Sequence, residues 1–386
     1  MFDKFAAFAD EPDRLIAEVA QSLAATGDMH RLFELRLLQE RRRLGLAIDR
    51  RTSIDDVDEP LRSQLEAAYL AACREVGELL LEAGRLREAW MYLRPAGDKL
   101  SLRRRLARVT ADEARADELI QLALFEGVDP ERGFAWLLAR QGSCQGITAL
   151  DALQDQLSLP ELSACAAVLV RHLSHELQGN LRGHLSRLGR SAPPELSVGQ
   201  LIERFPELQS GGDYHVDPSH LASAMRYARL ITEPAVVSRA RDMAAYGARL
   251  PAMFQYAGEP PFEDLYAAHH QLFQATLGVE AEAAVNYFAA RATSTGTPPA
   301  AAEAVEAYLV VLARAGRWND ALAAYRELVP VEQKLSRFAP TLLELAQRSG
   351  AWELYGAICR ERQDLLGYAT GLIAQGAARE GHGVGP

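Results

Sequence analysis

The feature that most constrains this chain is a repeated pattern of helix, glycine and helix. Long segments consist of Ala, Leu, Arg, Glu and Gln, with apolar residues three and four positions apart. That spacing is typical of an amphipathic α-helix. Glycine accepts the left-handed backbone conformation that closes a helix C-terminus. The pattern therefore predicts pairs of helices joined by glycine turns, around Gly27, Gly84, Gly316 and Gly350.

The stretch AYLVVLARAGRWNDALAAYRELVP shows how two such helices can pack. Ala321 and Tyr325 lie four residues apart, on one face of the second helix. The small alanine lets the paired helix approach, and the larger tyrosine fills the groove between them. One hairpin cannot bury its own apolar face, so hairpins stack on one another. We therefore predict an all-α fold, an irregular α-solenoid of stacked helical hairpins with a variant central region.

This unit resembles a tetratricopeptide repeat in its second half, at Gly316, Trp318, Ala321 and Tyr325. The similarity covers residues 303–330 best and residues 66–95 next. Leu309 stands where such repeats usually have a small residue, and Pro330 comes early. The resemblance implies a right-handed helical solenoid with a concave face that binds a protein or peptide partner.

Two stretches rich in proline and glycine interrupt the helical pattern, residues 189–213 and residues 250–265. Such residues favour turns and loops, and the first stretch is long enough for one short helix as well. Aromatic residues are enriched between residues 200 and 290. We expect an N-terminal helical-hairpin array over 1–188, a linker or insertion over 189–213, a central His- and aromatic-rich helical region over 214–300, C-terminal tetratricopeptide-like hairpins over 301–376, and a flexible tail over 377–386.

Composition and charge exclude several classes of function. The formal net charge is −10 and the isoelectric point is about 5.5, which argues against nucleic-acid or membrane binding, since both need a basic surface. The basic runs 41–43 and 103–105 fit solvated helix faces. The first residues carry acids and no long apolar run, so we expect no signal peptide, and no stretch approaches 18 uninterrupted apolar residues. The four scattered cysteines suggest reduced, buried thiols, so we expect a cytoplasmic protein.

Histidines are concentrated in the middle of the chain. Seven of the nine lie between His172 and His270, far more than an even spread would place there. The first group is RHLSHE, in which His172, His175 and Glu176 share one face of a helix. Two imidazoles and a carboxylate can ligate a divalent metal. The alternative is an exposed polar stripe on that helix.

The second group lies in YHVDPSH, which holds His215, Asp217 and His220. Asp217 followed by Pro218 predicts a helix start, because Asp is a favoured N-cap and Pro a favoured first helical residue. A carboxylate has two oxygens, so the cap and a metal-ligand role are compatible. Either histidine could also serve as a ligand or simply flank the helix start.

The third group is LYAAHHQLF, in which Tyr266 and His270 share one face and His269 points about 100° away. We expect only one of the adjacent histidines to face a pocket, and His270 is the candidate ligand. The alternative is that one hydrogen-bonds within the core and the other meets solvent. His184, next to Gly183 in a basic segment, is predicted to lie on the surface.

If the three groups converge, they would form a site for non-haem iron, manganese or zinc, with the candidate ligands His172, His175, Glu176, His215, Asp217, His220 and His270. The sequence contains no phosphate-binding glycine loop, no H-E-x-x-H and no G-x-S-x-G. Two hypotheses remain, and they leave open whether the chain is an enzyme. One is a scaffold for a protein or peptide partner, and the other is a metal-binding protein or metal-dependent enzyme. The sequence does not decide the oligomeric state.

Overall fold

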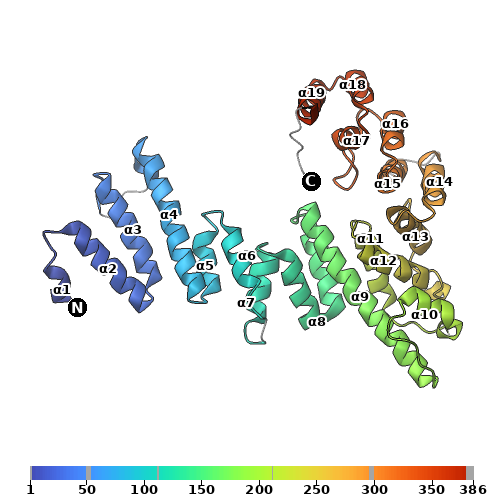
Figure 1. Cartoon of the computed structure of the whole chain (residues 1–386), viewed down its shortest axis with the longest axis horizontal. Helices are drawn as coiled ribbons and strands as arrows, with labels where there is room; N and C mark the ends of the chain where they lie inside the picture. Colours follow the sequence, from blue (N-terminus) through green and yellow to red (C-terminus); the bar gives the residue numbers. More distant parts are fainter. Residues whose placement is uncertain (1, 49–53, 111–112, 211, 295–299, 380–386) are drawn as a thin grey trace. The chain divides into compact units, whose positions relative to one another are not determined.

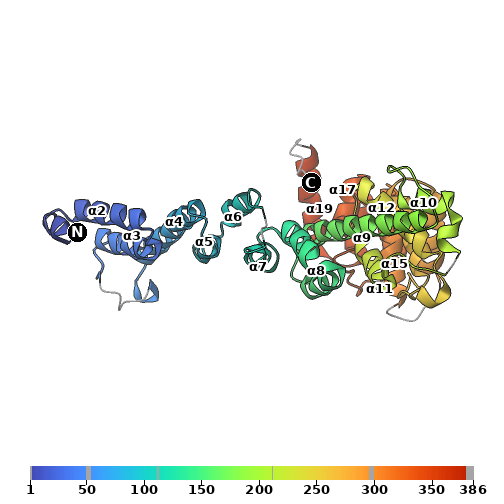
Figure 2. The same ribbon diagram turned by 90° about the horizontal axis from the view of Figure 1, so that it is seen from below.

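The computed structural model describes residues 2–48, 54–110, 113–210, 212–294 and 300–379. These residues form helices and no β-strand, as the all-α prediction requires. Helices that follow one another along the chain make most of the helix-to-helix contacts. The chain divides into two compact units, Met1–Trp136 and Leu137–Pro386. Figures 1 and 2 show the helices of both units in two views.

The first unit is a succession of helices in chain order. Its apolar core includes Leu80, Leu93 and Leu102, from three successive helices. The last helix, α8, continues across the boundary between the units. The elements are α1 (Phe2–Ala6), α2 (Pro12–Thr26), α3 (Met29–Arg43), η1 (Ile54–Asp56), α4 (Leu61–Glu82), α5 (Leu86–Leu93), α6 (Lys99–Leu106), α7 (Ala116–Ile120), the single π-helical turn η2 (Gln121–Phe125) and α8 (Pro130–Leu153).

The second unit is built around the longest helix, α9 (Leu159–Arg187), with α10, α11 and α12 packed against it. Helices α13 to α19 then follow one another (Figure 1). The remaining elements are α10 (Val198–Arg204), η3 (Pro206–Gln209), α11 (Pro218–Ala228), α12 (Pro234–Gly247), η4 (Ala252–Phe254), α13 (Leu265–Thr276), α14 (Ala281–Ala292), α15 (Ala300–Arg314), α16 (Trp318–Leu328), α17 (Leu342–Ser349), α18 (Trp352–Glu361) and α19 (Leu365–Arg379).

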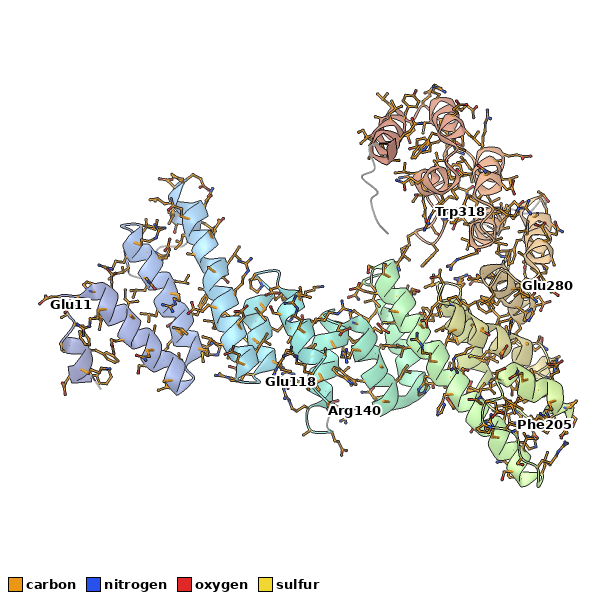
Figure 3. The ribbon with its side chains drawn as sticks, viewed as in Figure 1. Glu11, Glu118, Arg140, Phe205, Glu280 and Trp318 are labelled. Atoms are coloured by element: carbon orange, nitrogen blue, oxygen red, sulfur yellow. The ribbon has the colours of Figure 1, made fainter. Side chains whose placement is uncertain are left out.

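All four predicted glycine turns are confirmed. Gly27 lies between α2 and α3, Gly84 between α4 and α5, Gly316 between α15 and α16, and Gly350 between α17 and α18. Their φ angles are 73°, 73°, 74° and 72°. An L-residue with a side chain is strained at such angles. In Figure 3, Trp318 marks the start of α16, directly after the third of these turns.

The stretch 189–213 contains the short helix that the sequence predicts, α10, followed by η3. Both belong to the second unit. Asp242 of α12 caps α10, since its carboxylate accepts hydrogen bonds from the Ser197 hydroxyl at 2.6 Å and the Gly199 N–H at 3.1 Å. Phe205, labelled in Figure 3, is buried at the C-terminal end of α10. The predicted connector is therefore packed onto its neighbours.

Other sequence predictions have mixed outcomes. Cys73, Cys165 and Cys359 are buried free thiols, but Cys144 is exposed, contrary to expectation. The arginines of the two basic runs lie in the last turns of α3 and α6, where cations favour the helix dipole. Within the described part of the chain, no helix combines the length and the apolar character needed to cross a membrane.

Candidate functional site

A cavity of about 870 Å³ lies in the second unit. We call it the Arg229 cavity. Its walls come from α11, the loop 256–262, α13, α15 and the segment 336–339, with Leu159 at the start of α9. These elements are far apart in the sequence. Its volume lies within the ~300–1,000 Å³ range of ligand sites in proteins.

Apolar side chains form much of the wall. Leu265, His269 and Leu272 line it from α13, at the three- and four-residue spacing of one helix face. Phe262 is buried beside them, and its ring centroid lies 4.5 Å from that of His269. Val310 of α15 is half-buried and also lines the cavity. The cavity can therefore take an apolar group as well as polar ones.

Arg337 ties one rim of the cavity to a distant part of the unit. Its guanidinium donates a hydrogen bond to the Leu157 carbonyl at 2.9 Å and another to the Gln154 carbonyl. Both acceptors lie between α8 and α9, about 180 residues earlier in the chain. The adjacent Ser336 donates its N–H and its hydroxyl to Glu306 of α15, at 2.8 and 2.6 Å. These bonds hold the segment 336–339 across α15.

Arg229, the residue that follows α11, is one of the cations that line the cavity. Its guanidinium carbon lies 5.7 Å from the Phe262 ring centroid, a cation–π contact. No hydrogen bond or ion pair joins this side chain to another residue within the described ranges. Arg229 is exposed by its surface area, but the atoms packed around its guanidinium, and next the positive charge of Arg226, lower the pKa of Arg229. Its guanidinium nevertheless stays charged at neutral pH.

The other charged groups of the lining fall into two sets. Arg314 donates to the Ile231 carbonyl at 3.1 Å and to the Arg229 carbonyl at 3.4 Å, which ties α15 to the end of α11. Glu306 is held by Ser336, as described above. Glu259 and Glu303 also line the cavity, and their carboxylates accept no hydrogen bond from a described side chain. The negative charge of each favours the charged form of Arg229 and so raises its pKa.

His269 contributes a buried hydrogen-bond acceptor to this wall. It is 1% exposed, and its Nδ1–H donates to the Leu265 carbonyl at 2.7 Å. The other ring nitrogen, Nε2, therefore carries a lone pair, and it has no hydrogen-bond partner within the described chain. Burial is the main reason that the pKa of His269 falls to about 3. The ring is thus neutral at physiological pH, and its Nε2 is closed off from solvent.

A second, smaller pocket of about 350 Å³ lies between α9 and the segment 214–217. His215 is 7% exposed there. Its Nε2 lies 2.8 Å from Nδ1 of His184, and its Nδ1 lies 3.1 Å from the Tyr246 hydroxyl. The same hydroxyl accepts the His215 backbone N–H at 2.8 Å. These groups form a continuous hydrogen-bonded chain from Tyr246 through His215 to His184.

The His215 ring within this hydrogen-bonded chain is neutral at physiological pH. Burial, and then the adjacent imidazole of His184, lower the pKa of His215 to about 4. Burial raises the pKa of Tyr246 to about 12. If the tyrosine hydroxyl donates to Nδ1 of His215, then Nε2–H of His215 donates to His184, and every group of the chain has a partner. That arrangement fixes the segment before α11 against α9 and α12.

The structure places the predicted metal ligands in several locations. Glu176, His215 and Asp217 line the second pocket. Asp217 is the N-cap of α11, as predicted, and accepts the Ser219 N–H at 2.8 Å. His175 is exposed on α9, whereas His172, His220 and His270 are half-buried. Among the residues with described positions, no three His, Cys, Asp or Glu side chains are arranged to hold a metal ion. The metal site stays a prediction.

Sequence reasoning missed three residues of these pockets. His184, predicted to lie on the surface, is half-buried against His215. His269 lines the Arg229 cavity, although His270 was the predicted pocket residue. Arg229 drew no attention because a single arginine after an amphipathic helix is common. One signal was present in the sequence, since Gly179 and Gly183 leave an open face on α9 where the second pocket forms.

Comparison with known proteins identified no similar protein. The chain matches no family model, no curated protein and no solved structure. Any conclusion about function must therefore come from the chain's own residues.

Proposed function

We propose that this chain is a helical-repeat binding protein, and that the Arg229 cavity holds a short segment of a protein partner. The observation that carries the proposal is the cavity itself, with its volume of about 870 Å³ and its open charged groups. The resemblance of the unit around Gly316 to a tetratricopeptide repeat supports the same conclusion. In such a solenoid, stacked hairpins create a concave surface for a partner.

The mixed chemistry of the cavity favours a peptide over a ligand of one type. The lining offers apolar surface on α13, a cation at Arg229 and carboxylates at Glu259 and Glu303. A peptide presents side chains of several types together with backbone N–H and C=O groups. The volume of the Arg229 cavity is near the upper end of the ~300–1,000 Å³ range of ligand pockets. The cavity therefore has room for a few peptide residues.

A selection from a displayed library of random 12-residue peptides tests this function. The chain is the target, and a Val310→Trp variant is used for counter-selection because a tryptophan there projects into the cavity and obstructs part of it. Ala323→Trp, on an exposed position of α16, is the matched control. Both variants must retain the wild-type thermal unfolding midpoint, and a smaller Val310→Phe substitution replaces the first if it does not.

The proposal predicts peptides that bind the wild type and Ala323→Trp equally and bind Val310→Trp at least tenfold more weakly, as expected when a central contact is blocked. A selection that yields no binders, or binders indifferent to the Val310→Trp substitution, would reject it.

A further inference from the structure

We infer that the bound segment carries one acidic side chain, which pairs with Arg229, and a basic side chain nearby, which pairs with Glu303 or Glu259. The inference rests on the proposed function and assigns the class of its ligand. It follows from a comparison of the charged groups that line the cavity. Some have hydrogen-bond partners within the protein, and others have none among the described residues.

Arg229 is positioned to bind a carboxylate. The contact with Phe262 supports the flat guanidinium while its N–H donors lack acceptors among the described residues. A guanidinium presents its donors in a planar fork, which matches the two oxygens of a carboxylate. Arg226 lies one turn earlier on α11 and uses one donor on the Ser223 hydroxyl at 3.0 Å. A carboxylate near Arg229 would also relieve the repulsion between these two cations.

The other polar groups of the lining are less available. Arg314 is bonded to two backbone carbonyls of the segment after α11, and Glu306 is bonded to Ser336. Those contacts fix walls of the cavity in place. Arg314 and Glu306 therefore have structural partners, whereas Arg229 keeps all its donors, and Arg226 all but one, without an acceptor among the described residues. The carboxylates without a described hydrogen-bond donor are Glu259 and Glu303.

The carboxylates of Glu259 and Glu303 exclude a bound segment that contains several acidic residues in a row. Glu303 projects from α15 and Glu259 from the loop 256–262, and both act electrostatically on Arg229. A run of acidic residues would bring further negative charge next to them, and like charges repel, although solvent screens the repulsion because both glutamates are exposed. A single acidic residue with a lysine or arginine nearby satisfies Arg229 and one of the glutamates together.

The remaining wall adds one requirement for the same segment. Leu265, Leu272 and Phe262 offer an apolar surface next to Arg229, which suits one apolar side chain.

Analogues of the best selected peptide test this inference by fluorescence anisotropy at low salt. One analogue replaces its acidic residue with the amide, and another replaces its basic residue with norleucine. Each is titrated against the wild type, Arg229→Gln, Glu303→Gln, Glu259→Gln and Arg171→Gln. The last is the control, since Arg171 pairs with Glu233 on the surface of α9, outside the cavity.

We expect Arg229→Gln to weaken the parent peptide by about tenfold or more, as is usual when hydrogen bonds to a charged group are lost. The acid and amide peptides should then bind Arg229→Gln equally. The lysine or arginine of the peptide should likewise lose its effect in Glu303→Gln or in Glu259→Gln. Arg171→Gln should bind every peptide as the wild type does.

Two results would overturn the inference while leaving the proposed function intact. In the first, cavity-dependent peptides carry no acidic residue, or bind as tightly when it is an amide. In the second, Arg229→Gln retains the preference for the acid. Failure of the proposed function looks different, because no selected peptide would then depend on Val310.

Discussion

At the residue scale, the second unit keeps histidines neutral by burying them. His269 has a folded-state pKa of about 3, and His215 one of about 4, against an ordinary value near 6.5. The unfolded chain binds protons at these rings below pH 6.5, while the folded chain does not. Folding stability from each ring is therefore complete above pH 6.5 and is lost as the pH falls toward the folded-state pKa.

The first prediction concerns this pH dependence. The free energy of unfolding should fall between pH 7 and pH 5, with each buried ring contributing up to about 1.4 kcal/mol per pH unit. Urea titrations at several pH values measure it. His269→Gln, which cannot bind a proton, should show a shallower slope than wild type. An unchanged slope would mean that His269 is protonated in the folded protein.

Single residues also show what the sequence could predict. Asp217 and Pro218 were predicted to start a helix and do so, because capping depends on neighbours within one turn. The choice between His269 and His270 depends on how α13 is rotated against its neighbours, which local spacing does not determine. His184 and His215 lie 31 residues apart in the sequence and come together only through packing of separate elements. Their hydrogen bond could therefore not be predicted from local sequence.

At the scale of elements, the second prediction compares two helix caps. Asp242→Ala removes the buried acceptor of Ser197 and Gly199, and should lower the free energy of unfolding by about 2 kcal/mol. Asp217→Ala removes an exposed cap of α11 and should lower it by about 1 kcal/mol. Urea unfolding of both variants measures the difference. Equal effects would mean that burial of Asp242 adds nothing to its capping.

The third prediction uses two glycines within helices. A β-carbon at Gly247 would lie 2.3 Å from the Tyr266 ring, whereas one at Gly179 would meet nothing within 4 Å. Gly247→Ala should therefore destabilise the packing of α12 on α13 by about 2 kcal/mol, through overpacking. Gly179→Ala should stabilise α9 by about 0.5–1 kcal/mol, through helix propensity. Thermal unfolding of the two variants should shift in opposite directions, and shifts of the same sign would contradict this packing.

Helices and the turns between them could be predicted from the sequence more completely than the contacts between distant residues. The glycine turns and the short helix within 189–213 were predicted because Gly, Pro and apolar spacing act over a few residues. The packing of that stretch onto α12 was not predicted, because it depends on Asp242, more than 40 residues away.

At the scale of the whole molecule, the Arg229 cavity exists because distant parts of the second unit are bonded to one another. Arg337 reaches carbonyls about 180 residues away, and no pattern in the sequence marks that pairing. The helices that form the walls were predictable, but the space between them was not. The predicted metal site also required long-range convergence, and it remains untested.

The fourth prediction addresses this connection. Arg337→Ala removes both hydrogen bonds and should increase amide hydrogen exchange in residues 331–341, since that segment loses its link to the turn before α9. Affinity for a cavity-dependent peptide should fall severalfold. Lys334→Ala, at an exposed position of the same segment, should change neither quantity. Equal effects of the two substitutions would show that the segment is not held by Arg337.

Photo-crosslinking from inside the cavity tests the central claim most directly. A benzoylphenylalanine in place of Phe338, an exposed aromatic residue of the cavity lining, and separately one at the exposed position 323, is irradiated with the labelled selected peptide bound, and the adducts are mapped by mass spectrometry. Our account predicts a labelled adduct from position 338, lost in the presence of excess unlabelled peptide, and none from position 323. An adduct from 323 alone, or none from 338 under saturating peptide, would contradict it.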